Sequence, residues 1–192
     1  MSFSRSIAVR GQDLRNRTIH LFGVIAALGL AGFINNVLLG GRLSAYGIVP
    51  RTQDGLWGIV LAPFLHASFN HLYANACGIL IFGGLVMLRS KQHFWVVTLL
   101  GTLVSGVGTW VFGRSAVHIG ASGVVFAYFG YLLFCGVFER RIWPLLLSCV
   151  VLAVWGPTLY GILPTQPGVS WEAHAFGLLG GIWAAQMVAR RA

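Results

Sequence analysis

The sequence predicts an all-helical membrane protein with six transmembrane helices, and three observations support this. Hydrophobic residues make up 57% of the 192 residues and charged residues only 9%, whereas soluble domains carry about 25% charge. Six apolar runs follow one another along the chain, and about 20 apolar residues suffice to cross the hydrocarbon core. Basic residues lie beside alternate ends of these runs. The lipid bilayer is therefore the expected solvent and partner of this chain.

The chain is predicted to form one membrane domain over residues 1–192, with a polar tail at 1–17 and six helices within about 18–189. The first run is longer than the core of a secretory signal, which indicates an uncleaved span, although Leu43-Ser44-Ala45 leaves cleavage open. The second run exceeds one span, so we expect 57–67 to be an interfacial lead-in and the helix to begin near Asn70. The six runs are 18–39, 57–88, 93–112, 120–138, 143–163 and 171–189.

The placement of lysine and arginine predicts the orientation. Ten of these residues lie at the two termini and in the second and fourth loops, against three in the other loops. The positive-inside rule therefore places both termini in the cytoplasm and loops 40–56, 113–119 and 164–170 outside. The formal net charge of +9 forms no clustered patch interleaved with aromatic residues, so nucleic acid is not an expected partner. A compact core without a soluble extension suggests a bacterial plasma membrane.

Polar groups inside membrane spans are costly, so each one is a candidate for function. Ser122 begins the fourth span between Gly120 and Gly123, which permit a sharp entry and leave the hydroxyl uncovered. His174 begins the sixth span on the same face as Gly177, and that smooth face allows close helix packing. Both spans run inward from outside, so the two side chains share a depth. A neutral imidazole can take the serine proton and make the hydroxyl an acyl-forming nucleophile.

Three further residues extend this candidate site. His71 and Asn75 are four residues apart on one face of the second span, again in its outer half. With the backbone amide of Ser122, they could hold a developing oxyanion. Phe126 lies on the face of Ser122, where its ring could lie under the imidazole. Glu172 is about 200° around the helix from His174, so a dyad without a third carboxylate is favoured.

Each residue also has a plainer interpretation when it is taken singly. Ser122 could cap a helix, and His174 could be a satisfied structural group. His71 and Asn75 could form an interhelical clasp, and Phe126 could be an ordinary core aromatic. A metal site built from histidines is a further alternative, although no carboxylate or cysteine joins them, and no metal or cofactor is expected. The histidines concerned are His66, His71, His118 and His174. The three cysteines are expected to be small buried hydrophobic residues.

These residues resemble the signatures of the rhomboid intramembrane serine proteases, over about Gly47 to Gly181. His66-Ala-Ser-Phe-Asn-His71-Leu-Tyr-Ala-Asn75 is similar to the second-span signature of that family. Gly120-Ala-Ser122-Gly123 is similar to its nucleophile motif, and Ala173-His174-Ala-Phe-Gly177 to its sixth-span base motif. The combination is specific because three separate spans carry it.

The resemblance implies a rhomboid-like bundle in which Ser122 is the nucleophile, His174 its base, and His71, Asn75 and the Ser122 amide the oxyanion site. It also implies single-span membrane-protein substrates, cleaved in the outer half of the bilayer, and a mobile cap formed by loop 164–170. Two departures stand out. Phe126 replaces the tyrosine of many members, and the first outward loop lacks the Trp-Arg pair of some bacterial members.

The sequence therefore predicts a serine endopeptidase of the membrane. The alternative is a noncatalytic rhomboid-like protein that binds membrane proteins for quality control, but Ser122 and His174 are both present. A small transporter is disfavoured because the chain shows no duplicated halves.

Overall fold

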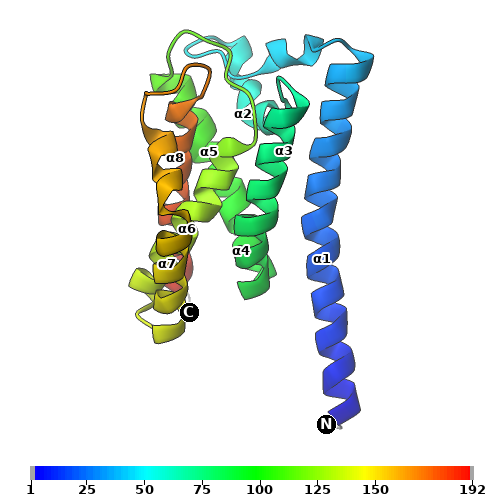
Figure 1. Cartoon of the computed structure of the whole chain (residues 1–192), viewed down its shortest axis with the longest axis vertical. Helices are drawn as coiled ribbons and strands as arrows, with labels where there is room; N and C mark the ends of the chain where they lie inside the picture. The colour runs from blue at the N-terminus through cyan, green and yellow to red at the C-terminus, as the bar shows by residue number, and fades with distance from the viewer. Residues whose placement is uncertain (1–2, 191–192) are drawn as a thin grey trace.

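A computed structural model of the chain describes residues 3–190, with side chains from residue 11 onward. Within that range the regular elements are helices, and the only strand-like pairing is a single bridge between Ile48 and His118. Figure 1 shows the helices standing side by side, with α1 at the edge of the bundle beside α3 and α4. The α-helices are α1 (Phe3–Phe33), α2 (Gly58–Leu61), α3 (Phe69–Gly78), α4 (Gly84–Arg89), α5 (Lys91–Phe112), α6 (Ser122–Glu139), α7 (Ile142–Trp155) and α8 (Trp171–Ala189).

The prediction of an all-helical, multi-pass membrane protein is confirmed. In the described range, five helical segments are long and apolar enough to cross a bilayer, namely Gly11–Leu38, Phe69–Arg89, Lys91–Phe112, Ser122–Glu139 and Ile142–Ile162. The sixth predicted span forms α8, which has 19 residues. Its polar residues Glu172, His174 and Gln186 lower its mean hydropathy, so length and composition identify five spans in this range, not six.

The first helix begins earlier than the apolar run predicts. Residues 3–17 were expected only as a polar tail, yet α1 begins at Phe3 and continues past Phe33 through a π-helical turn at Ile34–Leu38. Once the apolar segment has formed a helix, each added residue contributes one backbone hydrogen bond, so extension into a proline-free segment is favourable. Residues 1–2 and 191–192 of the predicted domain, including Arg191, lie outside the described residues.

A short helical segment separate from the second span precedes it, where the sequence predicts the lead-in. The short helix α2 and a 3-10 turn at Ala62–Phe64 precede the second span, and Ser68 then caps α3 by accepting a hydrogen bond from the His71 amide at 3.2 Å. A serine hydroxyl at this position satisfies an amide that the helix itself leaves unpaired. α3, a π-helical turn at Ile79–Gly83 and α4 form the continuous span Phe69–Arg89.

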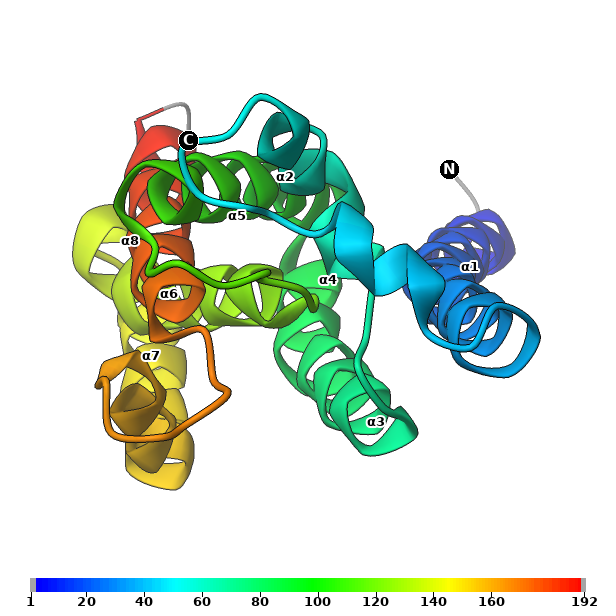
Figure 2. The same ribbon diagram turned by 90° about the horizontal axis from the view of Figure 1, so that it is seen from above.

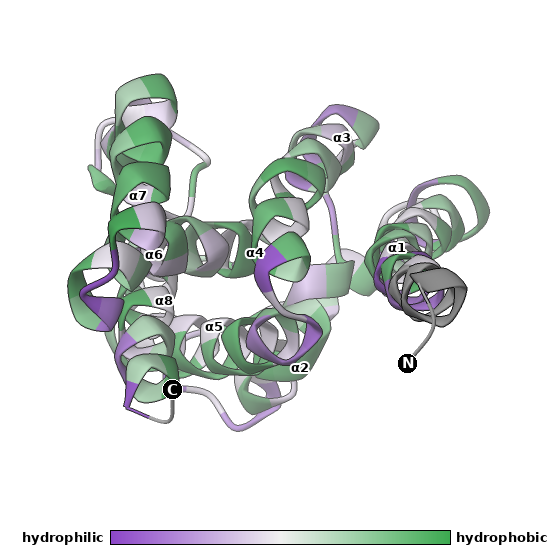
Figure 3. Cartoon of the chain, turned by 90° about the horizontal axis from the view of Figure 1, so that it is seen from below, coloured by the Kyte–Doolittle hydropathy of each residue, from purple (hydrophilic) through white to green (hydrophobic). Residues whose placement is uncertain are grey.

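The helix α6 lies at the centre of the bundle. Two thirds of it is buried (67%), compared with 11% for Ile142–Ile162 and 22% for Gly11–Leu38. Figure 3 shows that hydrophobic residues make up most of the surrounding helices, as expected for helices in lipid. Large exposed side chains on these faces include Leu30, Phe112 and Trp143.

Glycines let α6 and α8 meet backbone to backbone. A methyl group at Gly177 would collide with the Gly123 carbonyl, and one at Gly181 with the Ala127 carbonyl. The smooth face predicted for the last span is thus the face that packs against α6. Small residues of this kind allow the close approach that stabilises helix pairs in lipid.

The loop between α1 and α2 is tied to the loop between α5 and α6. Ile48 and His118 exchange backbone hydrogen bonds of 2.9 Å in both directions. The Arg51 guanidinium donates to the carbonyls of Val111 and Gly113 at 3.1 and 2.8 Å. Figure 2 shows the first of these loops running across this end of the molecule. These contacts brace the bundle even though the loop lacks a Trp-Arg pair.

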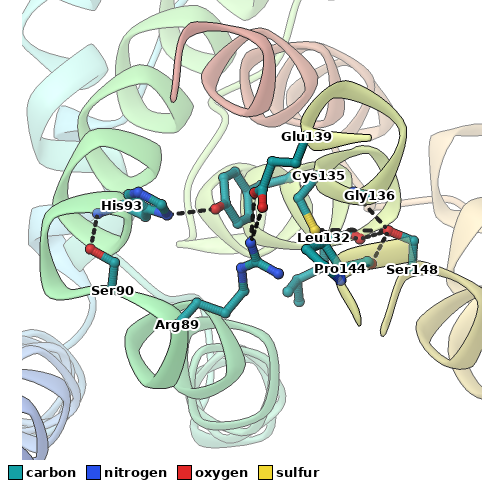
Figure 4. A network of polar contacts seen from close by, with 10 residues as sticks. Arg89, Ser90, His93, Leu132, Cys135, Gly136, Glu139, Pro144 and Ser148 are labelled. Atoms are coloured by element: carbon teal, nitrogen blue, oxygen red, sulfur yellow. Dashed lines mark hydrogen bonds and ion pairs between the residues drawn. The ribbon is translucent and has the colours of Figure 1, made fainter. Parts of the chain in front are cut away.

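A second polar network lies at the opposite end of the bundle, and Figure 4 shows its contacts from close by. Arg89 at the end of α4 forms an ion pair with Glu139 at the end of α6, with N–O distances of 2.6 and 2.8 Å. His93 Nδ1 lies 2.7 Å from the Tyr131 hydroxyl. On α7, Ser148 donates to the Leu132 carbonyl at 2.8 Å. This network joins α4, α5, α6 and α7 at the end away from Ser122.

Candidate active site

Ser122 is the first residue of α6, and the glycine before it shapes the entry of the chain into the helix. Gly120 has a φ of 113°, a left-handed conformation that residues with a side chain rarely adopt. Its amide donates to the Ala62 carbonyl at 2.8 Å, which anchors the turn to the interfacial lead-in. The side chain of Ser122 remains partly exposed. The backbone amide of Ser122 belongs to the first turn of α6, where amides have no partner within the helix.

His71 and Asn75 lie directly against this turn. A methyl group at Gly120 would lie 2.6 Å from Nε2 of His71 and 3.4 Å from Nδ2 of Asn75. Asn75 is buried, and its Nδ2 donates to the His71 carbonyl at 3.1 Å, so its side chain is held in place by the preceding turn of α3. The two residues predicted from their four-residue spacing therefore border the loop that leads into Ser122.

The imidazole of His174 is fixed by two contacts. It stacks on the Phe126 ring with centroids 4.2 Å apart and planes 9° apart. Its Nδ1 lies 2.8 Å from the carbonyl oxygen of Gly161, in the turn that follows α7. A carbonyl oxygen can only accept a hydrogen bond, so Nδ1 is the donor and the neutral ring keeps its lone pair on Nε2. A ring in this state has the nitrogen that a general base needs.

The starts of α6 and α8 meet beside these residues. Gly123 follows Ser122 and packs against Ala173 and Gly177, which lie on either side of His174. From α5, the Ser105 hydroxyl donates to the Ala173 carbonyl at 2.8 Å and touches Gly123 as well. In the described part of the chain, Ser122 and His174 form no hydrogen bond with each other. Catalytic hydrogen bonds are often long before substrate binds.

A group of contacts at the start of α8 was not foreseen from the sequence. The buried Glu172 carboxylate accepts from the Arg114 amide at 3.1 Å and pairs with its guanidinium at 3.5 Å. His118 Nδ1 lies 2.7 Å from the Ser170 hydroxyl, and its Nε2 lies 3.0 Å from the Arg114 carbonyl. These bonds fasten the α5–α6 loop to the first turn of α8, close to His174. The one available signal was an acidic residue two positions before His174.

His66, the first residue of the second-span signature, is fully buried and packs edge-on against the His71 ring at 5.0 Å. Neither of its ring nitrogens has a hydrogen-bond partner among the described residues. Burial and, to a smaller extent, the neighbouring His71 together lower the pKa of His66 from 6.5 to about 4. His66 is therefore neutral at physiological pH.

The four histidines of the alternative metal site do not gather at one point. Among the described side chains, no group of three or more His, Cys, Asp or Glu is placed to hold a metal ion. His118 is occupied by Ser170 and Arg114, and His174 by Gly161.

Comparison with known sequences identifies the protein family to which a chain with this fold and these motifs belongs. The profile of the rhomboid domain family matches residues 53–191, and the chain belongs to the rhomboid family. An uncharacterized protein of Mycobacterium tuberculosis is 38% identical over 173 residues, which cover 85% of this chain and 72% of that protein. A Bacillus subtilis protein, YdcA, whose name describes it as a "putative rhomboid protease", is 30% identical over 133 residues, covering 67% of this chain and 65% of its own.

Proposed function

We propose that this chain is an intramembrane serine endopeptidase that cleaves peptide bonds within or beside transmembrane helices. The observation that carries the proposal is the fixed His174 ring, held by Gly161 and Phe126 beside the helix start that bears Ser122. Membership of the rhomboid family and the similarity to the Bacillus subtilis protein support the same reaction class.

In the proposed reaction, the Ser122 hydroxyl attacks the scissile carbonyl carbon while Nε2 of His174 takes its proton. The tetrahedral intermediate collapses to an acyl-enzyme on Ser122, and the imidazolium returns the proton to the departing amine. Water then attacks the acyl-enzyme by the same route and releases the carboxylate product. The Gly161 carbonyl accepts from Nδ1 throughout, so it stabilises the tautomer and the imidazolium alike.

The oxyanion is assigned to His71, Asn75 and the amide of Ser122. The first two border the Gly120 turn, and the third is an unpaired amide of the first turn of α6. Donors held in place before the reaction stabilise charge as it develops, and removing one such donor typically costs about 3 to 4 kcal/mol. The reaction as proposed uses no metal ion or cofactor.

The proposed topology is one membrane domain with six spans, in which α8 is the sixth. Glu172 and His174 lower its hydropathy, but both are buried inside the bundle, so the lipid does not meet them. Basic residues favour cytoplasmic termini, which puts Ser122 and His174 in the outer half of a bacterial plasma membrane. The proposed substrates are single-span membrane proteins.

The test is cleavage of a fluorescent transmembrane-helix substrate by the full chain in liposomes. Ser122→Ala and His174→Ala should each abolish cleavage while the protein stays folded. Ser115→Ala, which changes an exposed serine in the α5–α6 loop, and His20→Ala on α1 are the matched controls and should cleave like wild type. Equal cleavage by all variants would contradict the proposed dyad.

A noncatalytic rhomboid-like binder is the competing function. It predicts that folded wild type captures membrane-helix peptides without cleaving them. Such a result across several peptide sequences would replace the protease proposal.

A further inference from the structure

Asp54 stands apart from the other acidic residues of this chain. The sequence contains four carboxylate side chains, and three of them form ion pairs. These are Asp13 with Arg17 at 2.7 Å, Glu139 with Arg89 at 2.6 Å and Glu172 with Arg114 at 3.5 Å. Asp54 has neither an ion pair nor a side-chain hydrogen bond among the described residues. In a chain with a formal charge of +9, this leaves one carboxylate unneutralised.

The arginine nearest in sequence in the same loop forms its hydrogen bonds with other groups. Arg51 lies three residues before Asp54, but its guanidinium donates to the carbonyls of Val111 and Gly113. Those bonds are part of the brace between the two loops. The Asp54 carboxylate is therefore available to a cation that comes from outside the chain.

Asp54 also lines a hollow with two aromatic residues. The hollow has a volume of about 370 Å³ and is formed by the α1–α2 loop and the last residue of α2, Leu61. Tyr46 and Trp57 contribute to its wall, and these residues are 61% and 74% exposed. The remaining wall is small or aliphatic, from Ala45, Gly47, Val49 and Leu61.

A carboxylate beside aromatic rings is suited to a substituted ammonium ion. The faces of tryptophan and tyrosine attract a cation through the ring quadrupole, which contributes about 0.5 to 1 kcal/mol at exposed sites. The carboxylate adds an ionic hydrogen bond, which a primary ammonium can donate and a trimethylammonium cannot. The combination therefore favours a primary ammonium group.

The position of the hollow indicates the source of that group. Tryptophan and tyrosine concentrate at the level of the lipid headgroups, and the loop crosses the Ser122 end of the bundle (Figure 2). Beside the hollow, Leu56 and Val60 expose apolar side chains that would face lipid. We propose that the hollow formed by Tyr46, Asp54 and Trp57 binds the ammonium group of a phosphatidylethanolamine molecule. The site is separate from Ser122 and His174, and its occupancy does not depend on proteolysis.

Native mass spectrometry of the delipidated full chain would test the proposal. The protein is titrated separately with short-chain phosphatidylethanolamine, phosphatidylcholine and phosphatidylglycerol. Asp54→Asn should weaken the first phosphatidylethanolamine adduct about threefold to fivefold, as expected for one exposed ionic contact. Asp13→Asn makes the same chemical change at a paired carboxylate, and its affinity should match wild type.

A local signal complements the mass measurement. In protein labelled with 5-fluorotryptophan, the Trp57 resonance, assigned with Trp57→Phe, should shift on addition of phosphatidylethanolamine and stay still in Asp54→Asn. Equal affinity of wild type and Asp54→Asn, or an unmoved Trp57 resonance, would overturn the site. Equal, Asp54-dependent binding of phosphatidylcholine would overturn its selectivity for a primary ammonium. Because neither measurement uses cleavage, a failed protease assay would leave this result standing.

Discussion

The imidazole of His174 lies flat against the Phe126 ring, with centroids 4.2 Å apart and an angle of 9° between the planes. A second constraint is the Gly161 carbonyl oxygen, which accepts a hydrogen bond from Nδ1 of His174. A ring held on its face and at one nitrogen has little freedom to rotate. In the proposed dyad, packing and one main-chain oxygen would take the place of the orienting carboxylate found in many serine hydrolases.

Phe126→Leu should lower kcat for membrane-helix cleavage about threefold to tenfold with little change in KM. The substitution keeps an apolar side chain but removes the stacked ring, a contact that contributes about 0.5 to 1.5 kcal/mol. Phe126→Tyr keeps the ring and should stay near wild type. Phe129→Leu makes the same change at a buried residue that does not stack on His174. An equal loss of kcat in Phe126→Leu and Phe129→Leu would show that general packing, not His174 orientation, is responsible.

Gly177→Ala and Gly181→Ala should each destabilise the folded protein by about 1 to 3 kcal/mol, because each new methyl group meets a main-chain carbonyl of α6. Unfolding in mixed micelles, followed by circular dichroism, measures this loss. Gly29→Ala on α1 is the control, since nothing lies within 4 Å of its added methyl group. Unchanged stability in Gly177→Ala would mean that α6 and α8 are not in close main-chain contact.

Glu172→Ala should lower the free energy of unfolding by about 1 to 3 kcal/mol, since it removes the acceptor of the Arg114 amide. Glu172→Gln should cost less because its amide oxygen can still accept that hydrogen bond. The same denaturation assay compares the two variants. An equal loss in Glu172→Gln and Glu172→Ala would contradict this account.

Stability should fall as the pH is lowered from 7.5 to 5, in part because of His66. Its pKa is about 4 in the folded protein and 6.5 when unperturbed, so the unfolded chain binds more protons between these values. The contribution is fully present above pH 6.5 and is lost as the pH falls toward 4. At pH 5 the loss is about 2 kcal/mol.

Denaturation of wild type and His66→Leu at both pH values isolates this contribution, because the other histidines are common to both proteins. His66→Leu should show a smaller pH dependence than wild type. His20→Leu, at a partly exposed histidine of α1, serves as the control and should keep the wild-type slope. Parallel slopes in wild type and His66→Leu would refute the buried, neutral state of His66.

The helices were predictable because apolar runs and their glycine and charged boundaries are local signals. The lead-in before Phe69 and the α6 start at Ser122 are examples. That His71 and Asn75 lie close to Gly120 was also predictable, because the helical spacing and the expected depth of the two spans put them near one another. The Gly161 contact was not predictable, because any residue supplies a carbonyl. Likewise, no local pattern pairs Arg114 with Glu172, which are 58 residues apart.

The main-chain contact between α6 and α8 also locks their register. The residues beside Gly177 are Phe176 and Leu178, and neither side chain would fit where the Gly123 carbonyl now lies. A screw motion of α8 by one residue, which combines about 1.5 Å along its axis with a turn of about 100° around it, would bring one of them into that space. This screw motion is therefore blocked in both directions, so the glycines help to set the heights of Ser122 and His174 relative to each other without taking part in the proposed reaction.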